Sequence, residues 1–342
     1  MGGKRLSERT MGHAKLGMLI DYYLADMQRR GCTDDSVATN RRGLRRFARS
    51  VNPESSSVTL LEVTEEVVDG YVSAMQQQTV KFEVHPNRKQ EPGKLSAFTI
   101  RKEVRILKGF GTWLQQEGFE NPFGGLVVPK EPKRLVSVLA DEEIDRILKS
   151  INPQTPIGSR LYAIVLLMLD SGPRMSEVVG ARMPDLDLET RQLRIIGKGD
   201  KERIIPFGAR TGKALLSYIH VHRPSPLTAT TDRVFLSMDG LPMTRNSLAG
   251  IVGRLKKASG VGRLHAHLFR HTFAVKYLMN GGDLVTLQRI MGHESLEVTK
   301  RYLSLTSAQV QLRYDSYSPV DRMPLSGLRR FGDKRTVVSA TQ

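Results

Sequence analysis

The sequence has little cysteine and no long hydrophobic run, and each shortage excludes a class of protein. A single cysteine, Cys32, can form neither an internal disulfide nor a zinc finger, and it indicates a reducing compartment. The longest apolar run, Leu161 to Leu169, is far shorter than the ~20 residues that cross a bilayer. The N-terminus lacks the charged and then apolar pattern of a secretion signal. We therefore expect a soluble, cytoplasmic protein without membrane contacts.

Acidic residues are also scarce relative to basic ones. The 342 residues include 52 Lys and Arg against 35 Asp and Glu, which gives a net charge of +17. This excess favours a polyanionic partner, with nucleic acid the leading candidate, although a solvated basic surface without a specific partner is the alternative. The proportions of hydrophobic (39%) and charged (25%) residues are typical of a globular protein, and the length predicts two domains.

Helical spacing of apolar residues dominates the first part of the chain. A periodic apolar pattern covers residues 16–27, and three further helices are predicted to begin at caps formed by Ser36, Thr64 and Thr99. We therefore expect residues 12–120 to form one all-helical domain.

Three segments without this periodicity separate or flank the predicted helices. Residues 1–11 are basic and rich in glycine, and we expect a mobile arm there. Residues 79–98 contain two prolines and are predicted to form a long loop. Residues 121–133 are dense in proline and glycine, so we place the linker between the two domains there.

The second predicted helix carries a strongly basic face. Its surface opposite the apolar residues holds five arginines, namely Arg41, Arg42, Arg45, Arg46 and Arg49. Five like charges without nearby acids repel one another unless an anion neutralises them. We therefore expect these arginines to bind DNA phosphates, with a solvated face as the alternative.

Beyond the linker the secondary structure becomes mixed. A buried helix is predicted over 161–169, and two strands, Leu193–Ile196 and Arg203–Phe207, flank Gly197-Lys198-Gly199-Asp200 in a pattern typical of a hairpin. Another short strand is predicted at Val234–Leu236, and helices follow. The predicted fold class is mainly α with two domains, a helical N-terminal domain and an α+β domain with a small antiparallel sheet.

Residues that can bind or attack a phosphodiester follow one another along this second domain. Arg174 lies at the end of a buried helix, where a guanidinium needs an anionic partner such as Glu177 or a ligand. His267 and Arg270 are three residues apart and so share a helix face. Each residue alone is more often structural than catalytic, but the order of the whole set is much more specific.

Through these residues the chain resembles the tyrosine recombinases, or phage-type integrases. The match consists of Arg174 with Glu177 in a Gly-x-Arg-x-x-Glu context, Lys198 in a glycine-flanked hairpin, His267-x-x-Arg270, Gly292-His293, and Tyr302. It covers about residues 134–305 through motifs and the helical domain only by architecture. Pro173 and Leu268-Phe269 depart from the usual residues of the family, but neither change removes a reacting group.

The resemblance implies a site-specific DNA recombinase that cuts and rejoins duplex DNA through a 3′-phosphotyrosyl intermediate, for integration, excision, transposition or resolution of a DNA element. It implies a core-binding (SAM-like) DNA-binding domain over 12–120, a catalytic domain over 134–305, and a tail over 306–342 that docks on a neighbouring subunit. It further implies a homo-tetramer on double-stranded DNA sites, with accessory DNA-bending or directionality proteins in some systems.

The chemistry of the matched side chains agrees with this reaction. A tyrosine phenol has a pKa of about 10 and needs a proton acceptor, for which His267 is the candidate. Arg174 and Arg270 match the negative charge on the non-bridging phosphate oxygens, and His293 can donate a further hydrogen bond. Lys198 can protonate the departing 5′ oxygen. Glu177 and His271 are expected to support these groups, His271 as a core histidine that helps to orient the site.

Several alternatives remain at this point. His265 and His267 could be metal ligands, but no cysteine or acidic third ligand lies beside them, and no phosphate-binding Gly-rich loop or acidic cluster is present. We therefore expect neither metal nor cofactor, and no need for ATP because the phosphotyrosine retains the bond energy. A type IB topoisomerase-like enzyme and a catalytically idle DNA-binding regulator are the alternative functions.

Overall fold

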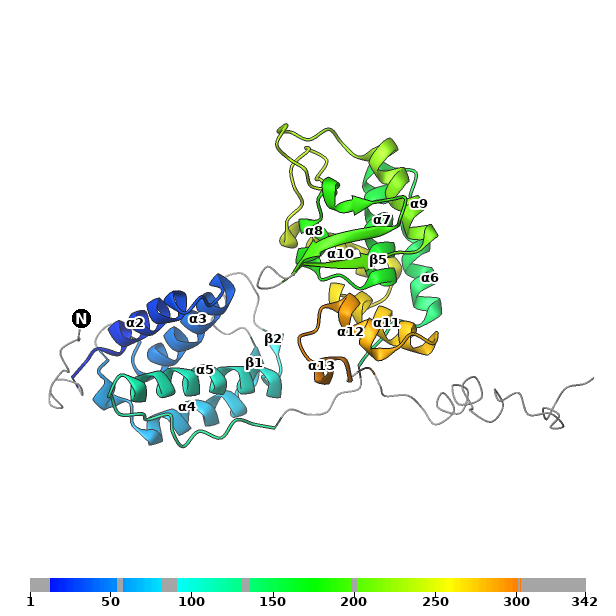
Figure 1. Ribbon diagram of the computed structural model, residues 1–342. Helices are drawn as coiled ribbons and strands as arrows, with labels where there is room; N and C mark the ends of the chain where they lie inside the picture. The colour runs from blue at the N-terminus through cyan, green and yellow to red at the C-terminus, as the bar shows by residue number, and fades with distance from the viewer. Residues whose placement is uncertain are drawn as a thin grey trace, which may run out of the picture. The chain divides into compact units, whose positions relative to one another are not determined.

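The computed structural model describes residues 13–53, 58–81, 91–130, 136–197, 202–300 and 302 (Figure 1). The chain divides near residue 134 into two compact units, and each unit has its own hydrophobic core. The structure is mainly helical with a small antiparallel sheet, so the predicted fold class is confirmed. The expected basic arm (1–11) and C-terminal tail (306–342) lie outside the described residues.

Helices build the first unit. In the described part of this unit they are α2 (Leu16–Arg29), α3 (Asp34–Val51), the 3-10 turn η1 (Leu60–Glu62), α4 (Glu65–Gln77) and α5 (Ala97–Gln116).

Two of the three predicted helix caps are wrong by one turn. Thr64 caps α4 as expected, but α3 is capped by Thr33 and α5 by Ser96. Ser36 and Thr99 instead donate their backbone N–H groups to these cap oxygens, at 3.3 and 3.1 Å. The reason is that a cap oxygen accepts from the residue three positions later, so two hydroxyl residues at this spacing are easily exchanged in a sequence.

The predicted loop over 79–98 is also partly wrong. It contains a short antiparallel pair, β1 (Val80–Lys81) with β2 (Glu91–Pro92), in which Val80 pairs with Pro92. Its last residues form the start of α5. Proline lacks a backbone donor and for that reason suits such a short, two-stranded ladder.

Aromatic rings form the centre of the first unit's core. The Phe123 ring lies 5.4 Å from that of Phe47 and 5.9 Å from that of Phe110, and all three side chains are fully buried. Burying one such side chain stabilises a fold by about 1.5–3 kcal/mol. Phe123 comes from the segment predicted as a linker, so the first unit extends past residue 120.

The second unit surrounds a three-stranded sheet with helices. The strands are β3 (Leu186–Asp187), β4 (Gln192–Ile196) and β5 (Glu202–Pro206), in the order β3-β4-β5. The described helices and helical turns are α6 (Asp141–Lys149), α7 (Pro156–Ser171), α8 (Met175–Gly180), η2 (Met183–Asp185), α9 (Ala209–Ser217), η3 (Tyr218–His222), α10 (Arg245–Ser259), α11 (Ala266–Met279), α12 (Leu284–Met291) and α13 (Leu296–Lys300).

The predicted hairpin is confirmed, with Ile195 paired to Arg203 and Leu193 paired to Ile205. Leu193, Ile195 and Ile205 are buried. The strand predicted at Val234–Leu236 is wrong. Its three side chains are buried, but its backbone joins no sheet: Leu236 forms an isolated bridge with Pro242, and the preceding Arg233 forms one with Arg182. A short apolar run can be buried on every side without joining a sheet.

A glycine controls how closely α7 approaches α11. Gly172 ends α7 with φ of +61°, and a β-carbon there would lie 2.4 Å from a ring carbon of Phe273 on α11. Glycine therefore serves both the left-handed helix end and the close packing. This contact places the end of α7, two residues before Arg174, beside α11, which carries Arg270.

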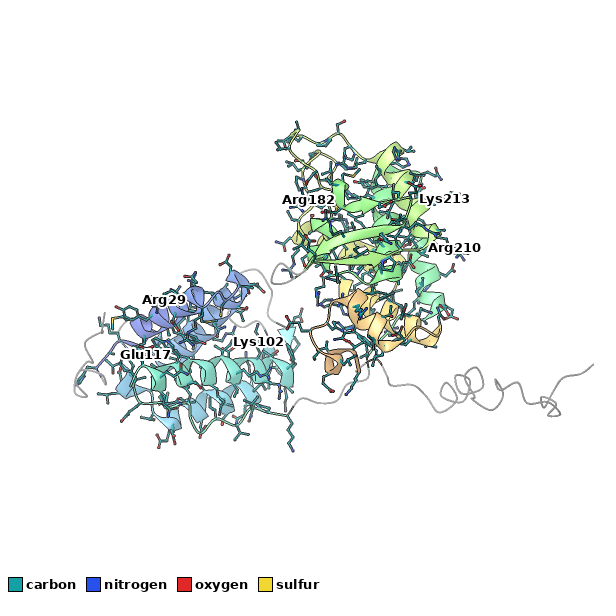
Figure 2. All side chains as sticks on the ribbon, in the orientation of Figure 1. Arg29, Lys102, Glu117, Arg182, Arg210 and Lys213 are labelled. Carbon is teal, nitrogen blue, oxygen red and sulfur yellow. The ribbon has the colours of Figure 1, made fainter. Side chains whose placement is uncertain are left out.

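Charged side chains cover the outside of each unit, among them Lys102 on α5 and Arg210 and Lys213 on α9 (Figure 2). None of the helices in the described ranges is long and apolar enough to cross a membrane.

Candidate active site

Arg270 is a buried cation held by neutral acceptors. Its residue surface is 4% exposed, and its guanidinium donates to the carbonyl oxygens of Gly172 (2.6 Å) and Met291 (2.7 Å). These carbonyls end α7 and α12, and the negative end of a helix dipole favours a cation. Burial, followed by the charge of Arg174, lowers the pKa of Arg270 to about 10, so the group remains protonated at neutral pH. Among the ion pairs of the described residues none includes Arg270, which leaves its charge available to an anion.

Arg174 lies at the start of α8 and is partly open to solvent. Its backbone N–H donates to one oxygen of Glu177 at 2.6 Å, and its Nη1 donates to the other at 2.9 Å. Its Nη2 reaches the Gly292 carbonyl at 3.3 Å. The side chain is 36% exposed, so it is anchored at its base and accessible at its tip.

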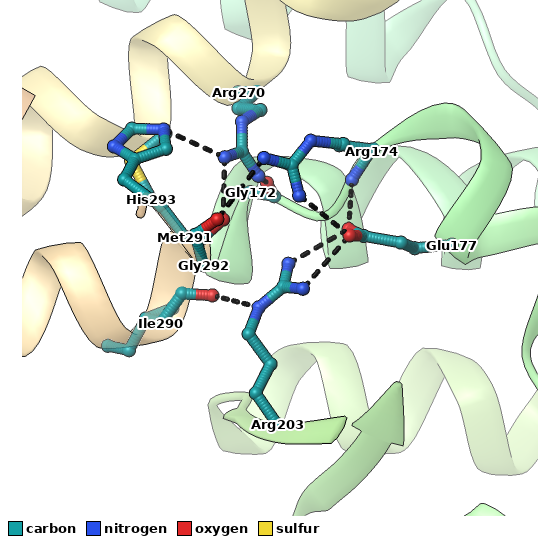
Figure 3. A network of polar contacts seen from close by, with 9 residues as sticks. All are labelled: Gly172, Arg174, Glu177, Arg203, Arg270, Ile290, Met291, Gly292 and His293. Atoms are coloured by element: carbon teal, nitrogen blue, oxygen red, sulfur yellow. Dashed lines mark hydrogen bonds and ion pairs between the residues drawn. The ribbon is translucent and has the colours of Figure 1, made fainter. Parts of the chain in front are cut away.

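Arg203 is a third guanidinium in this network, and the sequence analysis missed it. It donates to both oxygens of Glu177, each at 2.9 Å, and its Nε donates to the Ile290 carbonyl at 2.8 Å (Figure 3). A signal was present, because Arg203 shares the inward face of β5 with the buried Ile205. An arginine at an inward strand position needs an acidic partner.

Glu177 stays ionised because of these partners. Burial alone would raise the pKa of its carboxyl, but the hydrogen bonds and charge of Arg203, with further hydrogen bonds from Arg174, hold that pKa below its ordinary value. The side chain is 3% exposed. The expected support of Arg174 by Glu177 is thus observed, with Arg203 as the second partner.

Gly292 and His293 follow the end of α12. Gly292 has φ of +61°, and a β-carbon there would lie 2.9 Å from Cζ of Arg203, so a side chain would displace that arginine. His293 Nε2 lies 3.0 Å from Nη2 of Arg270, and its Nδ1 lies 2.8 Å from Oγ1 of Thr299. Because a guanidinium can only donate, Nε2 accepts and Nδ1 carries the proton. In this arrangement the ring N–H of His293 is directed at Thr299, so donation to a phosphate requires that contact to open or Nε2 to gain a proton.

The Tyr302 hydroxyl lies beside His271. Its oxygen is 2.9 Å from His271 Nδ1, and its ring lies nearly parallel to that of His293 at 6.3 Å. Tyr302 is 3% exposed. His267 was predicted as the proton acceptor, and the structure places His271 within hydrogen-bond distance of this hydroxyl.

His267 lies one helical turn before His271 on α11, with the two ring centres 6.0 Å apart. Loss of hydration around its imidazole and then the charges of Arg270, His265 and Arg174 lower the pKa of His267. Its neighbour His265 contacts the Arg263 carbonyl through Nδ1 at 2.9 Å. Within the described ranges no three His, Cys, Asp or Glu side chains gather as ligands of a metal ion.

The structure brings most of the predicted site residues together. Arg174, Arg270, His293 and Glu177 share one network, and Tyr302 and His271 lie against it. Lys198 lies outside the described residues, although β4 and β5 flank its position.

The five arginines of α3 lie in the first unit, and all are exposed. The expectation that they lack nearby acids is wrong for two of them. Arg45 lies 3.6 Å from Asp21, and Arg46 lies 3.5 Å from Glu103, a buried carboxylate that also accepts from the Tyr71 hydroxyl at 3.0 Å. These acids come from α2 and α5, so local sequence could not reveal them.

Comparisons with known proteins agree on one family. The profile of the phage integrase family matches residues 137–309. A tyrosine recombinase XerC of Bacillus pumilus is 34% identical over 259 residues, which cover 74% of this chain and 84% of the relative. A tyrosine recombinase XerC of Bacillus subtilis is 31% identical over 258 residues, with the same coverage of 74% and 84%.

Two solved structures share the fold. The Tn1549 transposon integrase in complex with transposon right end DNA has a TM-score of 0.69 at 20% identity, covering 89% of this chain and 100% of that one. The XerH site-specific recombinase bound to difH substrate has a TM-score of 0.65 at 18% identity, covering 93% and 98%.

The electrostatic surroundings of His267 predict a low titration midpoint. In the protein labelled at histidine, NMR titration should place the His267 midpoint below the ordinary value of about 6.5. Arg174→Gln should raise this midpoint, because the variant removes a positive charge that opposes the imidazolium. Arg194→Gln serves as the control. Arg194 is paired with Asp185 and does not contribute to the shift of the His267 pKa, so this variant should leave the His267 midpoint unchanged. A midpoint at or above the ordinary value in the unaltered protein would contradict these surroundings.

Proposed function

The chain belongs to the phage integrase family of tyrosine recombinases, and from this premise we propose that it is a site-specific DNA recombinase. In this proposal it cuts and rejoins duplex DNA through a covalent link between a 3′ phosphate and Tyr302. One observation carries the assignment of the site: the buried cation Arg270, which forms no ion pair among the described residues, contacts His293, whose ring stacks with that of Tyr302. A nucleophile beside an unneutralised cation suits attack on a phosphodiester.

The arginines would stabilise the transition state. Attack on phosphorus concentrates negative charge on the two non-bridging oxygens, and a guanidinium can donate two parallel hydrogen bonds to such oxygens. Arg270 is fixed by two carbonyls and Arg174 by Glu177, so little reorganisation is needed when charge develops. Removal of one such donor typically costs a reaction about 2.7–4 kcal/mol.

Proton transfer accompanies both halves of the reaction. As Tyr302 Oη bonds to phosphorus, its proton passes to His271 Nδ1, the atom that lies 2.9 Å from this hydroxyl and accepts from it in the tautomer protonated at Nε2. The bond from phosphorus to the 5′ oxygen breaks, and this oxygen takes a proton from Lys198. Because His271 takes the proton in this scheme, the proposed role of His267 is to hydrogen-bond to the phosphate. Attack by a 5′ hydroxyl of another strand reverses these steps, so no ATP or metal enters the scheme.

The assembly is part of the same proposal. The XerH and Tn1549 relatives are described as bound to their DNA substrates, and we infer that duplex DNA sites are the partner here as well. Strand exchange between two such sites requires four copies of the chain, acting in a bacterial cytoplasm with or without accessory DNA-bending proteins. A type IB topoisomerase-like activity is the alternative, and it would relax supercoils without exchanging strands.

Trapping the covalent intermediate tests the nucleophile. The protein is incubated with fragmented DNA of the organism that encodes it, denatured, and the linked DNA and peptide are sequenced. We expect one recurrent DNA site joined to Tyr302, and no adduct with Tyr302→Phe, which lacks only the reacting oxygen. Duplex binding should stay within about threefold, since the variant keeps the ring and all cationic groups. An adduct that persists in Tyr302→Phe or maps to Tyr314 or Tyr317 would overturn the assignment.

A comparison of His271 variants tests the proton acceptor. His271→Ala should slow single-turnover cleavage of the recovered site by roughly a hundredfold, a typical contribution of general base catalysis. His271→Asn retains a hydrogen-bonding atom near the Nδ1 position but cannot take the proton, so it should be equally slow. Full recovery in His271→Asn would reduce His271 to a group that only orients Tyr302. His265→Ala, which alters an exposed histidine bonded to a carbonyl, is the matched control.

The first unit is proposed to bind the DNA backbone. Its basic surface continues from α3 to α5, where Arg101, Lys102 and Arg105 line one groove with Thr39 and Asn40 of α3. Arg41, Arg42 and Arg49 form no ion pair within the described part of the chain, which leaves their charges available to phosphates.

Salt dependence of binding tests this surface. Replacing both Arg41 and Arg42 by alanine should weaken binding to every duplex and reduce the slope of log K against log salt by up to about two. Arg29→Ala, an exposed arginine of α2 paired with Asp26, is the control and should leave the slope unchanged. Arg46 is avoided, because its loss would leave the buried Glu103 without its cation. An unchanged slope in the double variant would indicate a solvated face.

A further inference from the structure

We propose that Arg203 is a positioning residue of strand cleavage: it neutralises Glu177 so that Arg174 keeps its positive charge for the scissile phosphate. This inference rests on the proposed function, because it explains how one of the phosphate-binding groups stays competent. Arg203 itself is 12% exposed and is committed to protein groups.

Arg203 and Arg174 share the carboxylate of Glu177 unequally. Arg203 approaches both oxygens through two nitrogens at 2.9 Å, which is the two-pronged geometry that suits guanidinium and carboxylate best. The Arg174 side chain has one bond, from Nη1 to Oε1 at 2.9 Å, while its backbone N–H occupies Oε2 at 2.6 Å. Arg203 is therefore the main counterion of Glu177. The Arg174 guanidinium uses only one nitrogen on this carboxylate, so its other N–H groups can donate elsewhere.

Charge in the network explains why this division matters. Three guanidiniums, those of Arg174, Arg203 and Arg270, surround one carboxylate. Without Arg203, the nearly buried Glu177 would have Arg174 as its nearest cation, and a buried carboxylate without full compensation is costly. Arg174 would then be drawn into a closer pair with Glu177, which would offset its positive charge and occupy its remaining donors.

Backbone contacts fix Arg203 in the position that this role requires. Its Nε donates to the Ile290 carbonyl, and its guanidinium fills the space where a β-carbon of residue 292 would lie. The Gly292 carbonyl in turn accepts from Arg174. Arg203 thus joins β5 to the end of α12 at the point where α12 meets Arg174 (Figure 3).

A double-variant cycle on single-turnover cleavage of the trapped DNA site tests the proposal. Arg203→Met keeps the length of the side chain without its charge, and we expect cleavage to slow by about ten- to a hundredfold while duplex binding changes little. Adding Glu177→Gln to Arg203→Met removes the carboxylate that captures Arg174, so the double variant should recover at least about fivefold of this loss. If Arg203 only braced the fold, the second substitution would remove more bonds and deepen the defect.

Two further measurements separate charge from structure. Arg203→Lys keeps a cation beside Glu177 but loses the two-pronged contact, so its cleavage defect should be clearly smaller than that of Arg203→Met. A methylphosphonate at the scissile position lacks one charged oxygen, so the Arg203→Met defect should shrink on that substrate. Arg194→Met, which breaks the pair between Arg194 on β4 and Asp185 at the end of η2, is the matched control and should cleave normally.

The outcomes distinguish this inference from the function on which it rests. If the unaltered protein forms no adduct on Tyr302, the proposed function fails. If it does so but Arg203→Met cleaves at the unaltered rate, or Arg203→Lys is as slow as Arg203→Met, or the double variant is slower than the single one, the role of Arg203 is overturned.

Discussion

One buried carboxylate, that of Glu177, holds together the elements that carry the site. It joins the start of α8 to β5 through Arg174 and Arg203, and Arg203 extends the connection to the end of α12. A charge in this position costs several kcal/mol unless it is fully paired, so the arrangement in which both arginines reach it is favoured. The positions of the Gly292 carbonyl and of His293 follow from that constraint.

Helix ends hold the second cation of the site, Arg270. Arg270 forms no direct ion pair among the described residues and is held by carbonyl oxygens at the ends of two helices, α7 and α12. Both ends are closed by glycines in the left-handed conformation, Gly172 and Gly292, and each glycine touches a side chain where a β-carbon would lie. An acid beside Arg270 would neutralise it, whereas carbonyls hold it in place and leave its charge for a phosphate.

The first unit uses buried acid in a different way. Glu103 is buried between Arg46 and the hydroxyl of Tyr71, whose pKa is raised by burial and by the neighbouring carboxylate. Arg46 is therefore partly a structural residue, although it lies in a row of arginines that otherwise face solvent. The basic face of α3 is thus a mixture of charges that support the fold and charges left for a polyanion.

The sequence by itself indicated the mainly helical fold and the β4–β5 hairpin, because helix and strand periods show which residues share a face. Arg174, Arg270, His293 and Tyr302 came from the resemblance of their motifs to those of the tyrosine recombinases. The sequence could not decide between His267 and His271, which are four residues apart and therefore lie on the same face of α11. Only the packing of Tyr302, from a distant segment, brought that hydroxyl to His271. The pairing of Arg203 with Glu177, and of Arg46 with Glu103, likewise depended on how separate elements pack, which no local pattern encodes.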